Sequence, residues 1–480
     1  MRPRTLHEIA HAVGGRLRPN GQSEAAADGV EVVTGVSIDS RIVSPGDLFV
    51  ALMGEHGDGH RFVGDAFGRG AAGALVRREG PRSTHTAGGA LIEVADPARA
   101  LLDLARHERD AMTATVVGIT GSTGKTCTKD LTAAVLGRRL RVVASPASFN
   151  NEIGLPLTIL SAARDTEAVV CEMGARGRGH IRMLCRVSRP DIGVVTNVGV
   201  AHMELFGSPE ALREAKAELP ESLEPNGTAV LNGDDPVVRT YTRRTRGRVV
   251  LFGRGSDADV RAERVTMDPR TGRASFRLVS PAGVARVTLP VPGEHIVPDA
   301  LAAAAVGLAL EVPIEDIAAG LAGARITGGR MEVLETPDGL RVVNDAYNAN
   351  PASMAAALKA ASWMAGSERC IAVLGPMAEL GPVSTAEHDR VGRLLARLRI
   401  DVLVTVGTEA RLIASGAERE GVEPERIVRC DDVSQAVAAV RSLATAGDLI
   451  LVKASRVARL ERVAEALANT RAEAAAGAGA

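Results

Sequence analysis

The sequence predicts an α/β protein of three domains: a smaller α/β domain, a central domain with a parallel sheet of the P-loop type, and a C-terminal Rossmann-like domain. Three observations support this fold class. The chain has 480 residues, more than one hydrophobic core ordinarily holds. From residue 112 onward, short β-branched runs alternate with helical runs rich in Ala and Leu. A glycine-rich stretch separates the first such strand from its helix.

The predicted boundaries follow changes in this pattern. Residues 1–111 contain short strand-like runs such as DLFVAL and GALVRR between turns. In residues 112–327 the strands are predicted at ATVVGIT, AVVCEM, DIGVVTNV and TAVLNGDD, and ARITGGRMEVLE is predicted as a linker. In residues 328–480 they are predicted at LRVVNDAY, RCIAVLGP, DVLVTVG and DLILVKAS. Alternation of this kind is typical of doubly wound parallel sheets.

Composition excludes several classes of function. The net charge is −1 and aromatic residues make up 2% of the chain, so we expect neither nucleic-acid nor membrane binding. The five cysteines are scattered and form no C-x-x-C pair, which favours a reducing compartment. The N-terminus has no signal-peptide core and no apolar run approaches the length of a membrane span. We therefore expect a cytoplasmic protein. We also expect it to be a monomer.

The stretch VVGITGSTGKTCTKDL predicts a phosphate-binding loop. The usual spacing, G-x-x-x-x-G-K-[ST], would put the first glycine at Ile119, whereas this chain has Gly118 and Gly121. A strand, a glycine loop and a helix aim backbone N–H groups at one point, where phosphate binds. In that arrangement Lys125 reaches the outer phosphates and the Thr126 hydroxyl ligates Mg²⁺. A glycine-rich turn without a ligand is the competing interpretation. The predicted loop comprises Gly121, Ser122, Thr123, Gly124, Lys125 and Thr126.

Two strands end in residues that suit a metal site. Glu172 closes the AVVCEM strand, and His202 follows the DIGVVTNV strand. Ligands of an open parallel sheet bind beyond the carboxyl ends of its strands, so both side chains are candidate partners of Mg²⁺. His202 is equally compatible with a structural role, because histidine is an unusual Mg²⁺ ligand. Lys216, on the helix SPEALREAKAELPESL, would by pattern alone be a surface lysine.

The motifs together resemble the Mur ligases, the ATP-dependent amide-forming enzymes of peptidoglycan synthesis. TGSTGKT, FNNEIGLP, CEMGARGRGHI, TNVGVAHMELFGS and AKAEL occur in that family's order and spacing. NNEIG and NDAYNANPASM resemble the branch that adds D-alanyl-D-alanine to UDP-N-acetylmuramoyl-tripeptide. VSIDSRIVSPGDLFVAL and DGHRF resemble the family's uridine-nucleotide-binding domain, and the family's amine substrate binds the C-terminal domain. The resemblance covers nearly the whole chain.

The resemblance implies a role for each matched residue. Lys125, Glu172, His202 and Lys216 would be catalytic, with Thr126, Glu172, His202 and Lys216 at two Mg²⁺ sites. Lys216 matches a lysine that is carbamylated in several members, which turns a cation into an anion able to bind metal. Besides the loop, ATP would contact His295, Asp299, Arg330, Asp345, Tyr347, Asn348 and Asn350. The substrates would contact Ser37, Asp39, Ser40, Arg41, Asn150, Asn151, Lys453, Ser455 and Arg456.

The implied reaction is acyl activation. A substrate carboxylate attacks the γ-phosphate of ATP, and the incoming amine then displaces phosphate from the acyl phosphate. The carboxylate and the triphosphate repel one another, so Lys125 and the metal ions would neutralise charge as it shifts. Closure of the domains would exclude water, which otherwise hydrolyses the acyl phosphate.

Four positions depart from the family pattern. Ile296 and Asp299 occupy places where the family usually has Asn near the adenine, and Asp299 lacks the amide's donor. Pro376 replaces the acid of LGDMxELG, and Ala454 replaces the glycine of LVKGSR. The last two lie where the amine is expected to bind. A related ligase that joins a different carboxylate and amine, for example in a secondary-metabolite pathway, therefore stays open as an alternative. A catalytically silent nucleotide-binding protein is a third hypothesis, against which the intact motif residues speak.

Overall fold

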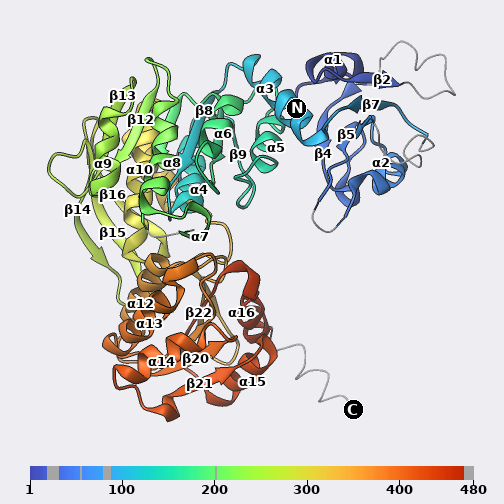
Figure 1. Cartoon of the computed structure of the whole chain (residues 1–480). Coiled ribbons are helices and arrows are strands. Elements are labelled where there is room, and N and C mark those ends of the chain that lie inside the picture. Colours follow the sequence, from blue (N-terminus) through green and yellow to red (C-terminus); the bar gives the residue numbers. More distant parts are fainter. Residues whose placement is uncertain (19–31, 55–56, 79–87, 200–202, 470–480) are drawn as a thin grey trace.

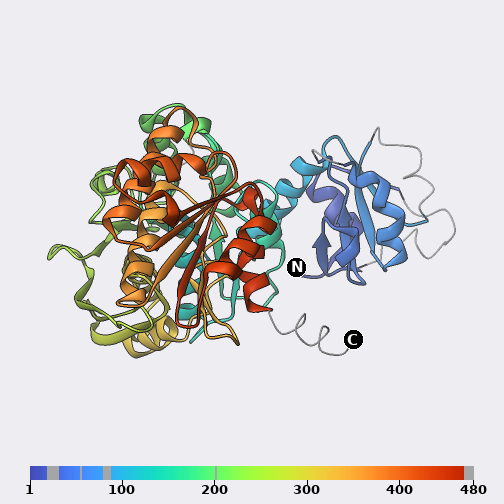
Figure 2. The ribbon, with the colours of Figure 1, turned by 90° about the horizontal axis from the view of Figure 1, so that it is seen from below.

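The computed structural model describes residues 1–18, 32–54, 57–78, 88–199 and 203–469. Three large sheets follow one another along the described chain, each with its own helices, and a two-stranded sheet of β1 and β3 accompanies the first. The N-terminal domain projects from one end of the central domain, and the C-terminal domain lies below the central domain (Figure 1). Seen from below, the C-terminal sheet lies across the central domain while the N-terminal domain stays to one side (Figure 2).

The N-terminal domain is a five-stranded sheet in the order β2-β7-β6-β5-β4, parallel except for β2. Its elements are β1 (Arg4–Thr5), α1 (Leu6–Ala12), β2 (Arg16–Arg18), β3 (Val32–Val33), β4 (Gly35–Ser37), η2 (Ser40–Ile42), β5 (Asp47–Val50), η3 (Gly59–Phe62), α2 (Val63–Gly68), β6 (Gly73–Arg77), β7 (Leu91–Val94) and α3 (Pro97–Asp110). Helix α3 begins with Asp96 as N-cap and Pro97 in its first turn. It leads into the central domain, where Arg109 Nε donates to the Ser188 carbonyl at 2.8 Å.

The central domain contains a nine-stranded sheet in the order β16-β15-β14-β13-β12-β11-β8-β10-β9. Its elements are β8 (Thr115–Thr120), α4 (Lys125–Leu136), β9 (Val142–Ala144), α5 (Gly154–Leu160), β10 (Ala168–Glu172), α6 (His180–Ser188), β11 (Ile192–Val195), α7 (Met203–Phe206), α8 (Pro209–Glu221), β12 (Thr228–Asn232), α9 (Pro236–Thr240), β13 (Arg248–Gly253), β14 (Val260–Met267), β15 (Arg273–Ser280), β16 (Gly283–Pro292), α10 (Val297–Ala309) and α11 (Ile314–Ala322). Strands β8 to β14 pair in parallel, whereas β15 pairs antiparallel with both β14 and β16. The sheet is therefore mixed rather than purely parallel: β15 alternates buried and partly or fully exposed residues, as a sheet with one solvated face does.

Strand β8 is the point where the order of the strands reverses. It pairs with β10 on one side and with β11 on the other. Because the crossover helices diverge there, a crevice opens beyond the carboxyl end of β8. The glycine loop follows β8 directly, and Glu172 ends the neighbouring strand β10.

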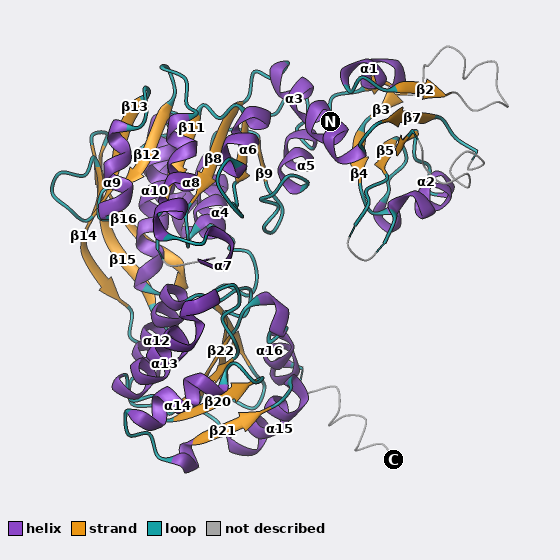
Figure 3. Cartoon of the chain, viewed as in Figure 1, coloured by secondary structure: helices purple, strands orange, loops and turns teal. Residues whose placement is uncertain are grey.

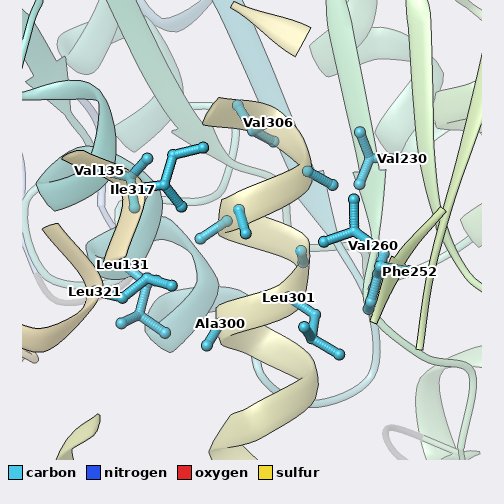
Figure 4. Close-up of a cluster of buried hydrophobic side chains, with 14 of the residues drawn as sticks. Leu131, Val135, Val230, Phe252, Val260, Ala300, Leu301, Val306, Ile317 and Leu321 are labelled. Atoms are coloured by element: carbon cyan, nitrogen blue, oxygen red, sulfur yellow. The ribbon is translucent and has the colours of Figure 1, made fainter. Parts of the chain in front are cut away.

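Helix α10 is the centre of the domain's core. Its sequence VPDALAAAAVGLA is apolar nearly all round, and α10 packs between the sheet and helices α4 and α11 (Figure 4). Gly307 permits this close approach, because a Cβ there would lie 2.7 Å from Val135 Cγ1. The packing holds the first turn of α10 beside the glycine loop.

The C-terminal domain is a six-stranded sheet in the order β17-β18-β22-β19-β20-β21. Strands β20, β21 and β22 of this sheet are flanked by helices (Figure 3). Its elements are β17 (Glu332–Glu335), β18 (Arg341–Asn344), α12 (Pro351–Ala365), β19 (Cys370–Leu374), η7 (Gly381–Val383), α13 (Ser384–Arg397), β20 (Val402–Val406), α14 (Arg411–Arg419), β21 (Ile427–Cys430), α15 (Val433–Leu443), β22 (Leu449–Lys453), η9 (Arg456–Ala458) and α16 (Glu461–Ala468). Only β17 runs antiparallel to its neighbour. The predicted linker ARITGGRMEVLE thus ends in a strand, since its last four residues form β17.

All five cysteines are buried and unbridged. Among the helices of the described ranges, none is long and apolar enough to cross a membrane.

Candidate active site

A cavity of about 660 Å³ lies between the central and C-terminal domains. Its walls come from the carboxyl ends of β8 and β10, the first turn of α10, and the loops after β18, β19 and β22. The two domains meet across it through few polar contacts, which are described below.

A larger cavity of about 1000 Å³ lies at the opposite end of the central strands, where Asp191 precedes β11 and Gly227 precedes β12. Its arginines include Arg109, which hydrogen-bonds to carbonyls at the carboxyl end of α6. Arginines satisfy the last carbonyls of helices. The smaller cavity, at the switch point of the sheet, is therefore the candidate site despite its size.

The glycine loop has the geometry of a phosphate cradle. Gly124 has a φ of 79°, and a Cβ there would lie 2.2 Å from Asp299 Oδ1, so only glycine fits. Lys125 begins α4, and its Nζ donates to the Gly121 carbonyl at 2.7 Å. Burial lowers the pKa of Lys125, an effect that the nearby Glu172 carboxylate opposes. A cation and a helix N-terminus thus converge on one point.

Thr126 connects the loop to both domains. Its hydroxyl donates to Glu172 Oε2 at 2.8 Å and accepts from Arg330 Nη2 at 2.8 Å. The other Glu172 oxygen accepts from Asn150 Nδ2 at 2.8 Å, and Glu172 is 1% exposed. Arg330 Nε is buried without a hydrogen-bond partner. A buried guanidinium nitrogen without a partner beside a phosphate loop fits an anionic ligand.

Lys216 is buried, not on the surface. It lies in α8 and is 2% exposed, with Nζ 3.4 Å from Thr120 Oγ1 at the end of β8. Burial, reinforced by the charge of Lys125, moves the pKa of Lys216 well below its usual value. The lysine-on-surface interpretation is therefore wrong for this residue, and the neutral amine is the form that reacts with carbon dioxide.

The first turn of α10 places Asp299 on the cavity wall, and the short 3-10 turn η6 (Glu294–Ile296) just before it places His295 there. Asp299 Oδ1 accepts from the Thr128 hydroxyl at 3.2 Å. Burial raises the pKa of Asp299 to about 8, and it lowers the pKa of His295. The expectation that Asp299 lacks a donor is therefore incomplete, because a neutral carboxylic acid donates one hydrogen bond as well as accepting others.

The C-terminal wall is held by an ion pair and a stacked tyrosine. Lys453 Nζ lies 2.5 Å from Asp345 Oδ2 and donates to the Asn348 carbonyl at 3.0 Å. The Tyr347 ring contacts two guanidinium groups, with the carbon of Arg330 at 4.4 Å and that of Arg456 at 5.5 Å from its centroid. These contacts fix the wall before any ligand is present.

Two asparagines and a serine of the predicted site also have structural partners. Asn350 caps α12, where its side chain accepts from Ser353 N. Asn151 Oδ1 accepts from Gly154 N at 2.9 Å at the start of α5. Ser455 Oγ accepts from Ala378 N at 2.8 Å.

The structure brings most of the predicted residues together. The cavity is lined by Ser122, Thr123, Gly124, Lys125, Thr126, Asn150, Asn151, Glu172, Lys216, His295, Asp299, Arg330, Asp345, Tyr347, Asn348, Asn350, Lys453, Ser455 and Arg456. Gly121 contributes its carbonyl to Lys125. His202 lies outside the described residues, and within the described ranges no group of three His, Cys, Asp or Glu side chains forms a metal cluster.

Four predicted residues lie elsewhere. Ser37, Asp39, Ser40 and Arg41 belong to the N-terminal domain and do not line the cavity. There the hydrogen bond from Arg41 holds the pKa of Asp39 at about 2.

Sequence reasoning missed several residues of the cavity wall. Ser148 contacts the Tyr347 hydroxyl through its own hydroxyl, and Asn197 Oδ1 accepts from Thr123 N at 2.9 Å. Arg176 and His180 also line the cavity. Asn197 follows a strand end as Glu172 does, so the same signal was available for it. Ser148 had none, because its contact depends on how two domains meet.

These features define a class: a three-domain α/β protein with an ATP-type phosphate loop that a second α/β domain faces. Comparison with known proteins gives the family. The model described as "Mur ligase middle domain" matches residues 119–307, "Mur ligase, glutamate ligase domain" matches 329–456, and "Mur ligase family, catalytic domain" matches 32–109. The chain belongs to the Mur ligase family.

Its relatives agree with this assignment along the whole chain. The UDP-N-acetylmuramoyl-tripeptide–D-alanyl-D-alanine ligase of Mycobacterium tuberculosis (strain H37Rv) is 41% identical, over 93% of this chain and 94% of the relative. The Bacillus subtilis ligase of the same name is 37% identical over 93% and 94%. Among solved structures, MurF from Acinetobacter baumannii gives a TM-score of 0.84 at 29% identity, covering 97% and 98% of the two chains. MurF from Thermotoga maritima, in complex with ADP, gives 0.77 at 30% identity, covering 91% and 97%.

Proposed function

We propose that the protein is an ATP-dependent ligase that joins D-alanyl-D-alanine to UDP-N-acetylmuramoyl-tripeptide in peptidoglycan precursor synthesis. The observation that carries the proposal is the contact of Thr126, in the phosphate loop, with Glu172 of its own domain and with Arg330 of the C-terminal domain. This contact connects the proposed nucleotide site to the C-terminal wall of the cavity, where the second substrate would bind. The names of relatives that align along more than nine-tenths of the chain support the choice of substrates.

The proposal divides the work among the three domains. Residues 1–111 bind the uridine nucleotide, with Ser37, Asp39, Ser40 and Arg41 at the contact. Residues 112–327 bind ATP, and residues 328–480 bind the incoming amine, with Lys453, Ser455 and Arg456 near it. The donor carboxylate then lies beside Lys125, where positive charge offsets its repulsion from the triphosphate.

The residues fit a magnesium ion. The Thr126 hydroxyl and the buried Glu172 carboxylate are adjacent oxygen donors, the ligand type that Mg²⁺ prefers, and His202 is the further candidate. When bound, Mg²⁺ would neutralise charge on the phosphates. A carbamate on Lys216 would add an anion for a second ion. Lys125 and Arg330 meanwhile orient the phosphate oxygens, and the closed cavity excludes water from the activated acid.

Two departures from the family pattern are accommodated by the backbone. The Pro376 carbonyl accepts from Ser455 N at 2.9 Å, a role that needs no acidic side chain. Ala454 is fully buried and packs toward Gly375, which has no side chain to displace it. Neither position builds a new polar contact for another amine. We therefore retain D-alanyl-D-alanine as the proposed amine, and a cytoplasmic monomer as the proposed state.

The test is ligation by the purified protein. With ATP, Mg²⁺, UDP-N-acetylmuramoyl-tripeptide and D-alanyl-D-alanine, we expect phosphate release together with a product heavier than the nucleotide substrate by one dipeptide less water. Replacing the dipeptide with glycyl-glycine or D-alanine alone measures specificity for the amine. Phosphate release that requires a different amine would favour the alternative ligase, and none with any amine would support the silent nucleotide-binding protein.

A further inference from the structure

The loop that follows Glu172 carries an arginine that the proposed chemistry leaves unused. Arg176 lines the cavity, is exposed, and has no partner for its guanidinium among the described residues. Its neighbour Arg178 is also exposed but does not line the cavity. Exposed arginines are ordinarily solvated, so the position of Arg176 on the wall needs a second observation to carry meaning.

The loop is held rigidly at both ends. At its start, Gly174 N donates to the Asn150 carbonyl at 2.8 Å. At its end, the buried Glu218 carboxylate of α8 accepts from Gly179 N at 2.5 Å and from Arg182 N at 2.9 Å. A carboxylate at the start of α6 satisfies N–H groups that have no partner within the helix. The backbone of Arg176 is therefore placed by the fold.

An acidic group lies beside the arginine. Arg176 N donates to His180 Nδ1 at 3.2 Å, so the ring proton of a neutral His180 is on Nε2. That nitrogen lies 3.1 Å from Glu152 Oε2. The Glu152 side chain is 39% exposed, and its Oε1 makes no hydrogen bond within the described structure. Arg176 on the cavity wall thus offers a cation without a partner among the described residues. Glu152, which does not itself line the cavity, offers an accessible carboxylate oxygen one imidazole ring away.

The position fits the donor substrate. Helices α5 and α6, which begin beside Glu152 and at His180, lie between the phosphate loop and the N-terminal domain (Figure 1). In the proposed function, the uridine end of the donor binds the N-terminal domain and its reacting carboxylate lies near Glu172. Such a donor would pass the start of α5 and α6. In this binding mode, the side chain of the residue that carries the reacting carboxylate would extend toward Arg176 on the cavity wall.

We infer that Arg176 is a specificity-determining residue that binds a carboxylate at the end of that side chain, while Glu152 binds an ammonium group there. The inference rests on the proposed function. The preferred donor would have a last peptide residue whose side chain ends in both groups, as in 2,6-diaminopimelate. A lysine side chain offers the ammonium group alone and leaves Arg176 without a partner.

The experiment compares two donor nucleotides, with 2,6-diaminopimelate or lysine as the third residue, in the wild type, Arg176→Ala and the matched control Arg178→Ala. We expect Arg176→Ala to raise KM for the diaminopimelate donor about 10- to 100-fold, the loss of one charge-assisted contact. The kcat of this variant, its KM for ATP and its KM for the lysine donor should stay within about threefold of the wild-type values. Its melting temperature should not change. Arg178→Ala should change none of these. Glu152→Gln should raise KM for both donors.

Three results would overturn the inference. Equal losses on both donors would make Arg176 a general structural residue, and a raised KM for ATP would assign it to the triphosphate. An unchanged Arg176→Ala would leave it a solvated arginine. If the wild type ligates neither donor, the proposed function is wrong. The wild-type rate alone therefore distinguishes failure of the proposed function from failure of the inference about Arg176.

Discussion

The two walls of the cavity are built differently. On the central wall, the loop, Glu172 and Lys216 are held by contacts inside one domain, such as that between Asn150 and Glu172. The C-terminal wall has its own internal ion pair, Lys453 with Asp345, yet it reaches the central wall through a small number of side chains. Among the described residues, the polar side-chain contacts across the cavity include Arg330 with Thr126 and Tyr347 with Ser148.

This difference separates two tasks. The central wall is preorganised for phosphate, because its glycine loop and buried charges exist without the partner domain. The C-terminal wall determines when the site is complete, since its arginine reaches the phosphate loop only while the domains are together. Changes on the central wall should therefore abolish chemistry, and changes at the crossing contacts should weaken nucleotide binding.

The largest effect is expected from Lys125→Ala. The substitution removes the cation at the N-terminus of α4, and we expect turnover to fall by about 10³-fold or more. Melting temperature should change little, because the hydrogen bonds that Nζ makes within the described residues go to carbonyls of its own loop. Steady-state phosphate release measures the loss. Activity above a tenth of the wild type would contradict the assignment of this wall.

A comparable loss is expected from Lys216→Ala, with a distinguishing rescue. If the lysine acts as a carbamate, the cavity left by the substitution accepts a short carboxylic acid that restores the anion. We expect formate or acetate to recover part of the activity, and bicarbonate to stimulate the wild type. Lys216→Arg serves as the control, because it keeps a cation and should not be rescued. Absence of both effects would leave Lys216 as a buried structural lysine.

Much of the central wall is predictable from sequence, because its signals are local. The loop lies between one strand and one helix, and Glu172 ends a recognisable apolar strand, so counting residues along the chain was sufficient. Lys216 shows the limit of this reasoning. Its pattern is that of a surface lysine, and only the packing of α8 against the sheet makes it buried.

The C-terminal wall was less predictable because its contacts join distant segments. The Lys453–Asp345 pair spans 108 residues, and the Ser148–Tyr347 contact spans 199. The antiparallel strands β15 and β16 were also missed, although β15 has the alternation of a strand with one exposed face. Family resemblance named residues that line this wall but gave no reason for Asn350, whose side chain caps a helix.

An intermediate effect is expected at the crossing contacts. Arg330→Ala should raise KM for ATP by about 10- to 100-fold, because the guanidinium is the charged contact between the walls. Arg330→Lys keeps the charge but not the fork geometry or the stacking on Tyr347, so it should recover only part of the loss. Initial rates against ATP concentration measure both variants. A loss in kcat with KM unchanged would place Arg330 in the chemistry rather than in closure.

A smaller effect is expected from the second crossing contact. Tyr347→Phe removes the hydroxyl that contacts Ser148 and keeps the ring that the two guanidinium groups contact. We expect KM for ATP to rise by less than about tenfold, the contribution of one neutral hydrogen bond. Ser148→Ala should match it, and the double variant should add little. Additive losses in the double variant would show that the two hydroxyls act independently.

Asp299→Asn is expected to have the smallest effect on catalysis. It should also change how the stability of the protein depends on pH. Near neutral pH both the neutral acid and the amide offer a donor and an acceptor, so we expect kcat/KM to change by less than about threefold.

The stability effect has a sign fixed by the pKa. The pKa of Asp299 is raised from an ordinary value near 4 to about 8, so the folded protein binds a proton that the unfolded chain releases between those values. The free energy of unfolding of the wild type therefore falls across this window as pH rises. The asparagine variant has no carboxyl group to ionise at this position, so its free energy of unfolding lacks this pH dependence. The difference in melting temperature, variant minus wild type, should increase between pH 5 and pH 8 and then level off. The increase should be about 2–4 °C for each kcal/mol of unfolding free energy that the wild type loses. A constant difference would mean that Asp299 is ionised throughout. The central wall would then have a buried negative charge beside its phosphate loop, and the comparison of the two walls would lose its electrostatic basis.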